Sequence, residues 1–211
     1  FKQRKMALFF IFSMFLGVSL QITNGYANPF ISSFAAMPEY QDVYFVDHAN
    51  LLISLSQISE TLCILLIPFF LKRYGIKRVM LIAMVAWAFR FGFFAIGNPS
   101  FPAVTWFILS MIVYGVAFDF FNISGSLFVN NETDSSIRSS AQGLFMIMTN
   151  GIGASIGMLI AQAVVNNFTY SQEAGGQFYT VGEWPIVWGI FAAYALLVAI
   201  FFALIFKEKN Q

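Results

Sequence analysis

The 211-residue chain carries too few charged side chains for a protein that folds in water. Charged residues make up 10% of it, against 59% hydrophobic and 18% aromatic residues, and the formal net charge is +1, whereas soluble domains have about 25% charged residues. Such a chain cannot cover itself with a polar surface and must use lipid as its solvent. One histidine and one cysteine exclude a His-cluster metal site and a disulfide framework.

Six apolar stretches are long enough to be membrane-spanning helices. The hydrocarbon core of a bilayer is roughly 30 Å thick and a helix rises about 1.5 Å per residue, so one span needs about 20 residues. Turn-forming or polar residues separate the stretches. The sequence therefore predicts an all-α membrane protein, a bundle of six transmembrane helices at approximately residues 6–34, 47–71, 79–97, 102–129, 137–168 and 185–206.

The basic residues indicate how this bundle is oriented. Ten of the eleven Lys and Arg residues lie before the first span, between the second and third, just after the fourth, or after the sixth. The other three linkers contain acidic residues and no basic ones. Because cytoplasmic loops carry an excess of Lys and Arg, both termini are expected to face the cytoplasm.

Three ionisable residues, Glu60, Arg90 and Asp119, lie deep inside predicted spans. Each costs at least about 2.5–3.5 kcal/mol at a helix centre, so such residues are functional candidates by default. Counted along each helix from its basic end, they lie at roughly 17–20 Å. This is the midplane layer, where transporters place their substrate and coupling-ion sites.

These charges allow more than one interpretation. Arg90 and Asp119 lie at similar depth on consecutive helices, so they are either a structural ion pair or a pair that opens during transport. Glu60 has no obvious partner; burial favours the neutral form of a carboxyl group, which suits a proton carrier. The alternative for Glu60 is a hydrogen bond to a neighbouring helix.

Polar and aromatic residues share helix faces in the same layer, since side chains three or four apart are neighbours on a helix. The pairs are Gln21 and Asn24, Gln57 and Glu60, and Tyr114 and Phe118. Amides and a carboxylate can hydrogen-bond hydroxyls and a heterocycle edge, and rings can stack on a flat base. The alternative is interhelical hydrogen bonding and ordinary packing.

Glycines line the fifth span. Gly153 and Gly157 have the small-xxx-small spacing that lets two membrane helices approach closely. We therefore expect this face to pack tightly against another helix.

Four segments of the sequence are similar to segments of a known family. They are LQITN at 20–24, SLSQISETL at 54–62, SMIVYGVAFDFFNISGS at 110–126 and IRSSAQG at 137–143. These segments resemble the nucleoside:proton symporter family of the major facilitator superfamily, in particular the C-terminal half of bacterial nucleoside permeases, and the similarity extends over nearly the whole chain. The basic loop RYGIKR at 73–78 also looks like one that the superfamily repeats in each half.

The resemblance implies that residues 1–211 are the C-terminal six-helix bundle, equivalent to helices seven to twelve, of a carrier whose N-terminal half is absent here. It implies proton-coupled nucleoside import across the bacterial inner membrane by alternating access, with protons as the coupling ion and no other cofactor. The partners would be a nucleoside, the lipid bilayer and the N-terminal half, not a nucleic acid, in a monomeric carrier.

The family's binding residues fall on the positions already selected by depth. The implied substrate-binding residues are Gln21, Asn24, Gln57, Glu60, Tyr114 and Phe118. Candidates for proton coupling, from depth alone, are Glu60, Asp119 and Arg90.

Two other functions remain open at this point. Related carriers bind sugars or oligosaccharides with similar amides, and the chain is also interpretable as a structural half that is inactive without its partner. An enzyme is not expected, because the sequence has no nucleophile–base pair, metal set or cofactor motif.

Overall fold

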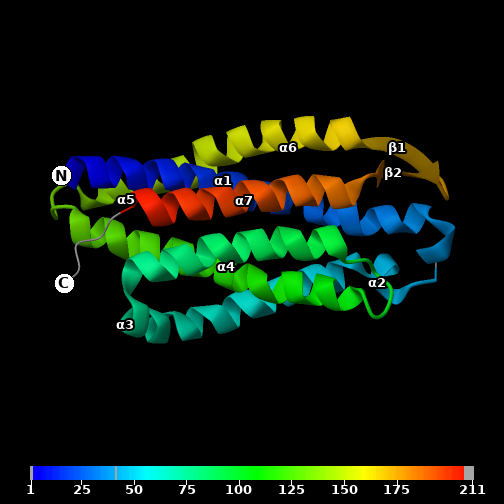
Figure 1. Ribbon diagram of the computed structural model, residues 1–211, viewed down its shortest axis with the longest axis horizontal. Coiled ribbons are helices and arrows are strands. Elements are labelled where there is room, and N and C mark those ends of the chain that lie inside the picture. The colour runs from blue at the N-terminus through cyan, green and yellow to red at the C-terminus, as the bar shows by residue number, and fades with distance from the viewer. Residues whose placement is uncertain (1, 41, 207–211) are drawn as a thin grey trace.

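Long helices make up almost all of the structure, a computed structural model that describes residues 2–40 and 42–206 (Figure 1). Lys207 and Lys209, two of the basic residues used to predict the orientation, lie outside the described residues. The main helices are α1 (Lys2–Ser33), α3 (Ala49–Ile96), α4 (Val104–Glu132), α5 (Arg138–Met146), α6 (Ala154–Phe168) and α7 (Trp184–Ile205).

Shorter elements connect them. Two single-turn helices, η1 (Phe34–Ala36) and η2 (Pro38–Tyr40), and the short helix α2 (Tyr44–Asp47) join α1 to α3. The π-helix η3 (Ile147–Gly153) joins α5 to α6 without a break. Five helical stretches within the described residues are long and apolar enough to cross a membrane, with α5, η3 and α6 counting as one.

The helix α3 contains two of the predicted spans. At Gly75 the backbone leaves the helical conformation (φ 76°, ψ 168°), a left-handed conformation that glycine adopts readily because it has no Cβ. Figure 1 shows that the two arms of α3 both extend from this bend toward the other end of the molecule, so the chain runs antiparallel along them. The predicted stretches 47–71 and 79–97 fall on these two arms.

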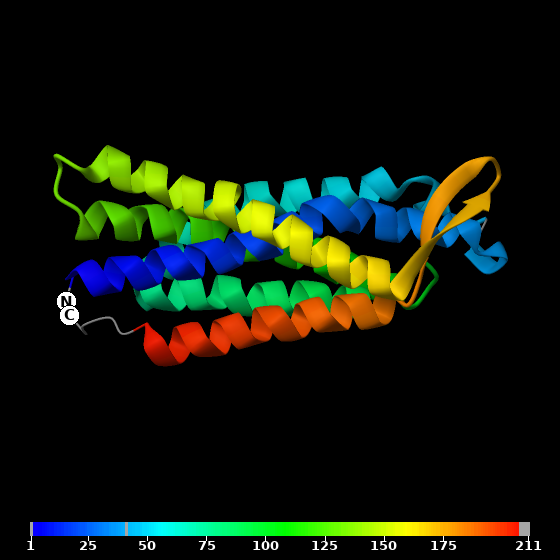
Figure 2. The same ribbon diagram turned by 90° about the horizontal axis from the view of Figure 1, so that it is seen from above.

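The bundle has two chemically different ends. The start of α1, the bend at Gly75, the α4–α5 connection and the end of α7 lie together at one end, which we call the basic end (Figures 1 and 2). There the Lys5 ammonium binds the Glu132 carboxylate at 2.6 Å. At the opposite end lie α2 and a β-hairpin, so we call it the hairpin end.

The hairpin corrects the all-α prediction. Strands β1 (Thr169–Ala174) and β2 (Gln177–Gly182) pair antiparallel between α6 and α7, with Thr169 opposite Gly182. The turn falls on Gly175 and Gly176, which both have positive φ and which the sequence had indicated only as a break between spans. Outside the lipid, strand pairing satisfies the backbone polar groups as well as a helix does.

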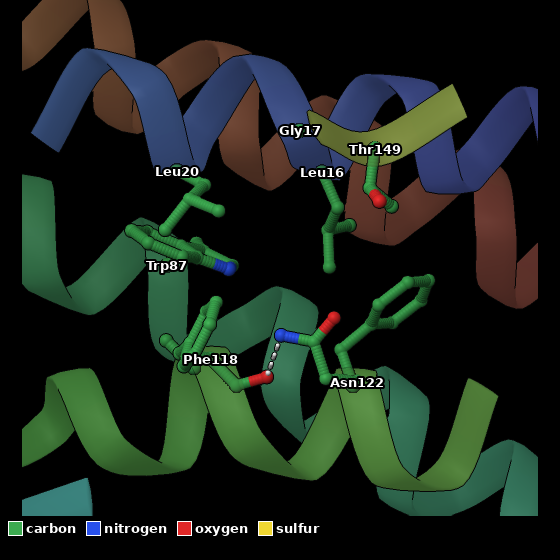
Figure 3. A pocket seen from close by; sticks show the side chains of 9 residues that line it. Leu16, Gly17, Leu20, Trp87, Phe118, Asn122 and Thr149 are labelled. Atoms are coloured by element: carbon green, nitrogen blue, oxygen red, sulfur yellow. Dashed lines mark hydrogen bonds between the residues drawn. The ribbon is translucent and has the colours of Figure 1, made fainter. Parts of the chain in front are cut away.

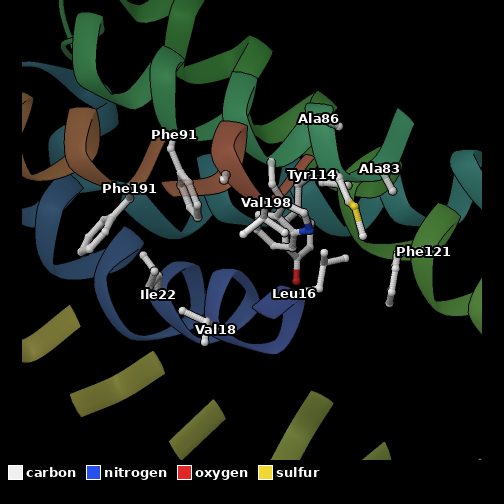
Figure 4. Close-up of a cluster of buried hydrophobic side chains, with 14 of the residues drawn as sticks. Leu16, Val18, Ile22, Ala83, Ala86, Phe91, Tyr114, Phe121, Phe191 and Val198 are labelled. Carbon is white, nitrogen blue, oxygen red and sulfur yellow. The ribbon is translucent and has the colours of Figure 1, made fainter. Parts of the chain in front are cut away.

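Aromatic and aliphatic side chains fill the bundle. Here α4 and α7 pack against α3, while α1 packs against η3 and α6. Figure 4 shows part of this core, including Leu16 of α1, Phe91 of α3, Tyr114 of α4 and Phe191 of α7. Among the largest fully buried side chains are Trp87, Trp184 and Trp188.

The expected close approach at the glycines of the fifth span is confirmed. A Cβ at Gly153 would collide with the main chain of α1 at Met14 and Gly17, and one at Gly157 would collide with Val18. From the other side, a Cβ at Gly17 would meet the Thr149 carbonyl group of η3. The α1 backbone therefore lies directly against η3 and α6.

We expect Gly153→Ala to lower the free energy of unfolding of the protein by about 1–3 kcal/mol, because overpacking forces the helices apart. The matched control is Gly143→Ala, where a Cβ meets no atom within 4 Å. That change should be neutral, or stabilising by up to about 1 kcal/mol from helix propensity. Thermal unfolding followed by tryptophan fluorescence in one detergent compares them; equal midpoints would contradict the close approach.

Candidate transport site

The site is built around Arg90, whose side chain is 2% exposed in the middle of the bundle. Its Nη1 donates a hydrogen bond to the Ser110 carbonyl oxygen at 2.7 Å, and its Nε donates to Thr23 Oγ1 at 3.3 Å. The guanidinium also lies 4.3 Å from the ring centroid of Tyr114 and 5.2 Å from that of Phe94. One cation thus connects α1, α3 and α4.

The ion pair between Arg90 and Asp119 is not formed. The interpretation of these residues as a structural ion pair was therefore wrong. Arg90 meets α4 at Ser110 and Tyr114, and Asp119 lies nine residues beyond Ser110, or roughly 13 Å along the helix. Counting residues from the loops was too coarse to show that Arg90 and Asp119 lie at different depths in the bundle. Among the side chains described for residues 4–40 and 42–206, the one ion pair is Lys5–Glu132.

Asp119 is buried without an ionic partner. Its side chain is 7% exposed, and its Oδ2 atom has no hydrogen-bond partner within the described part of the chain. A charge buried in this way is costly. Asp119 therefore remains a candidate for a group that carries a proton.

Two aromatic rings form a parallel pair on α4. The rings of Tyr114 and Phe118 are stacked, with centroids 5.8 Å apart and an angle of 1° between their planes. Trp87 from α3 meets Tyr114 edge-on at 5.8 Å and 87°. The prediction that these two residues share one face is confirmed. Tyr114 is buried and Phe118 is half-buried, so a flat ligand placed against the pair would meet it at Phe118.

Glu60 lies next to this aromatic pair. Its side chain is half-buried in the first arm of α3, and it lies within the influence of the Tyr114 hydroxyl and the Arg90 charge. The structure therefore brings Glu60, Arg90, Tyr114 and Phe118 together. A carboxylate beside a hydroxyl and a fixed cation can exchange a proton while its surroundings stay in place.

The three amides of the predicted site are accessible. Asn24 and Gln57 are exposed and Gln21 is half-buried. Their side-chain amides have no hydrogen-bond partner among the described residues. The helices that carry them meet near the hairpin end, where Asn28 Nδ2 of α1 donates to Asn50 Oδ1 of α3 at 3.2 Å.

Two residues that contribute to the site were missed in the sequence. Trp87 lines a narrow pocket with Phe118, Leu20 and Asn122 (Figure 3), and Thr23 binds Arg90. Trp87 lies three residues before Arg90, and so on the same helix face; this spacing would have found it. Thr23 had no such signal, because threonine is common in helices that pack inside membranes.

The arrangement offers hydrogen-bonding amides, aromatic surface, a carboxylate and a fixed cation. Metal binding has no support in the described residues, where no three His, Cys, Asp or Glu side chains gather.

Comparison with known proteins places the chain in a family. A family model described as "Nucleoside H+ symporter" matches residues 1–211. The chain is 53% identical over 211 residues to the xanthosine permease of Escherichia coli (strain K12), covering all of this chain and 49% of that protein. It is 50% identical over 210 residues to the nucleoside permease NupG of the same strain, covering 48% of it.

Solved structures agree with these matches. The crystal structure of nucleoside transporter NupG superimposes with a TM-score of 0.87 at 50% identity, covering 99% of this chain and 50% of that one. A mutant form of NupG gives a TM-score of 0.89 over 98% of this chain. The chain thus spans about half the length of the relatives it matches. It belongs to the nucleoside H+ symporter family, whose members are transporters rather than enzymes.

Proposed function

We propose that this chain is one half of a membrane carrier that imports nucleosides together with protons by alternating access. In this proposal it contributes six spans: α1, the two arms of α3, α4, the continuous helix from α5 to α6, and α7. The bend at Gly75 and the similarity to about half the length of each relative support its assignment as the C-terminal half of a major facilitator superfamily fold.

The orientation follows from charge. The basic end holds Lys5, Lys72, Arg73, Lys77 and Arg138, so the positive-inside rule favours the cytoplasm for this end and the outside for the hairpin. The membrane would be the bacterial inner membrane. The N-terminal half of the same carrier would complete the site, and we propose a monomer.

The observation that carries this proposal is the parallel pair of Tyr114 and Phe118 beside Glu60. A nucleoside joins a flat base to a ribose with several hydroxyls. In our proposal the base stacks on the aromatic pair, while Glu60 and the amides of Gln21, Asn24 and Gln57 bind hydroxyls and the base edge.

Proton coupling is proposed to depend on Glu60, with Asp119 as the second candidate. Glu60 is half-buried beside the substrate surface, so substrate and proton can influence each other there. Arg90 does not titrate in this scheme. Its hydrogen bonds to Ser110 and Thr23 hold a positive charge behind Tyr114, which favours return of Glu60 to its ionised form.

The first test is uptake of labelled uridine by the full-length carrier, with and without a protonophore. One proton moving down about 100 mV supplies about 2.3 kcal/mol, enough for an accumulation of roughly 50-fold. We expect this accumulation to disappear when the protonophore collapses the gradient. Absence of uridine uptake under both conditions would refute the substrate, and competition by free ribose against whole nucleosides would then test a sugar carrier.

The second test is Glu60→Gln, which keeps the size and hydrogen bonding of the side chain but cannot release a proton. We expect it to abolish proton-driven accumulation and the rise of uptake as external pH falls. Glu39→Gln, at an exposed acid in η2, is the matched control and should leave both unchanged.

Asp119→Asn is measured in parallel. If Glu60→Gln leaves uptake and its pH dependence intact, Glu60 is not the proton carrier. Loss of coupling in Asp119→Asn instead would move that role to Asp119.

A further inference from the structure

A second cavity lies on the basic side of the proposed site, between α4 and the helix formed by α5 and η3. Its volume is about 260 Å³. Four of its lining residues have amide or hydroxyl side chains: Asn122 and Ser126 from α4, Gln142 from α5 and Asn150 from η3. The described helices alone thus provide nearly the volume of a small-ligand pocket, about 300 Å³ or more.

The cavity adjoins the proposed site at Phe118. Phe118, whose ring is stacked on Tyr114, also lines the cavity. Asn122 and Ser126 follow it at intervals of four residues on the same face of α4, so they lie roughly 6 and 12 Å nearer the basic end. A ligand leaving the aromatic pair toward the basic end meets these side chains next.

One part of the polar lining is fixed by hydrogen bonds between the two helices. Gln142 Nε2 donates to the Ser126 carbonyl oxygen at 2.8 Å and to Asn130 Oδ1 at 3.0 Å. Ser126 Oγ donates to Gln142 Oε1 at 3.3 Å. These contacts hold the amide of Gln142 against α4 and keep the wall in place.

The other part of the lining has unused hydrogen-bonding capacity. Asn122 Nδ2 donates to the Phe118 carbonyl oxygen at 3.2 Å, and its Oδ1 has no partner among the described residues. The Asn150 amide makes only a long contact, 3.9 Å, to Met146 Sδ. Such groups facing lipid would be costly, so they call for an aqueous path, a polar ligand or a polar surface of the N-terminal half.

Apolar side chains complete the cavity. Phe145 is 2% exposed and Met146 is 54% exposed, which gives one rigid ring and one adaptable thioether surface. Together with the amides, this is the combination that a base with an attached ribose would contact.

We propose that this cavity is a second nucleoside subsite, which binds the substrate after it leaves the midplane site and before it reaches the cytoplasm. This inference rests on the proposed function, because it takes the substrate class and orientation from there. Asn122 and Asn150 would bind the ribose hydroxyls or the base edge, and Met146 would lie against the base.

The test uses the full-length carrier with its native cysteines replaced and Asn150→Cys introduced. In inside-out vesicles, a membrane-impermeant maleimide labels this thiol from the cytoplasmic face. Uridine at about ten times its dissociation constant for the subsite should slow labelling by about tenfold, since one site in eleven stays free. Ser139→Cys, at an exposed position outside the cavity, is the control and should label at an unchanged rate.

A second variant separates local binding from closure of the whole carrier. Met146→Ala, added to Asn150→Cys, removes apolar surface from the cavity and none from the midplane site. We expect it to raise the uridine concentration for half-protection by roughly two- to tenfold, and to leave uridine binding from the outer face unchanged. Leu159→Ala, at an exposed apolar residue of α6 outside the cavity, should alter neither.

Two results would overturn the subsite. The first is that uridine gives no protection in a carrier that still transports it. The second is protection that Met146→Ala does not weaken, which would mean that closure or the N-terminal half covers the cavity. Absence of uridine transport by the unmodified carrier would instead refute the proposed function.

Discussion

The buried Arg90 guanidinium holds the centre of the molecule together. A cation at this depth needs hydrogen-bond acceptors for its N–H groups and a favourable electrostatic environment for its charge, because the surrounding lipid provides neither. Here the main chain of α4, the Thr23 hydroxyl of α1 and the aromatic faces of Tyr114 and Phe94 share that task. Thus the same contacts that satisfy the cation also set the position of α4 relative to α1 and α3.

The proposed substrate surface depends on this arrangement. Tyr114 lies between Arg90 and Phe118, so the cation fixes the ring that begins the aromatic pair. Glu60 then lies next to a hydroxyl whose position is already set. A charge that does not move can bias a neighbouring carboxyl group at little cost in reorganisation, which is why we assign Arg90 a positioning role.

Much of this could be predicted from the sequence. The lengths and ends of the apolar stretches predicted the helices, including the two that meet at Gly75, and the spacing of Tyr114 and Phe118 predicted their shared face. Residue spacing failed where the outcome depended on how helices shift along each other, as with Arg90 and Asp119. The hairpin was missed because its strands, such as Thr169–Ala174, alternate weakly and are mostly exposed.

The hairpin also constrains how the helices beside it can move. Its strands pair from Thr169 to Gly182, and Glu183 N donates to the Phe168 carbonyl oxygen at 2.9 Å, so the ladder joins the end of α6 directly to the start of α7. These two helices are therefore joined to each other at the hairpin end. The continuous helix Arg138–Phe168 is roughly 45 Å long, so a tilt of about 5° at the joined end would displace its basic end by about 4 Å. Small adjustments near the hairpin would thus become large ones at the basic end.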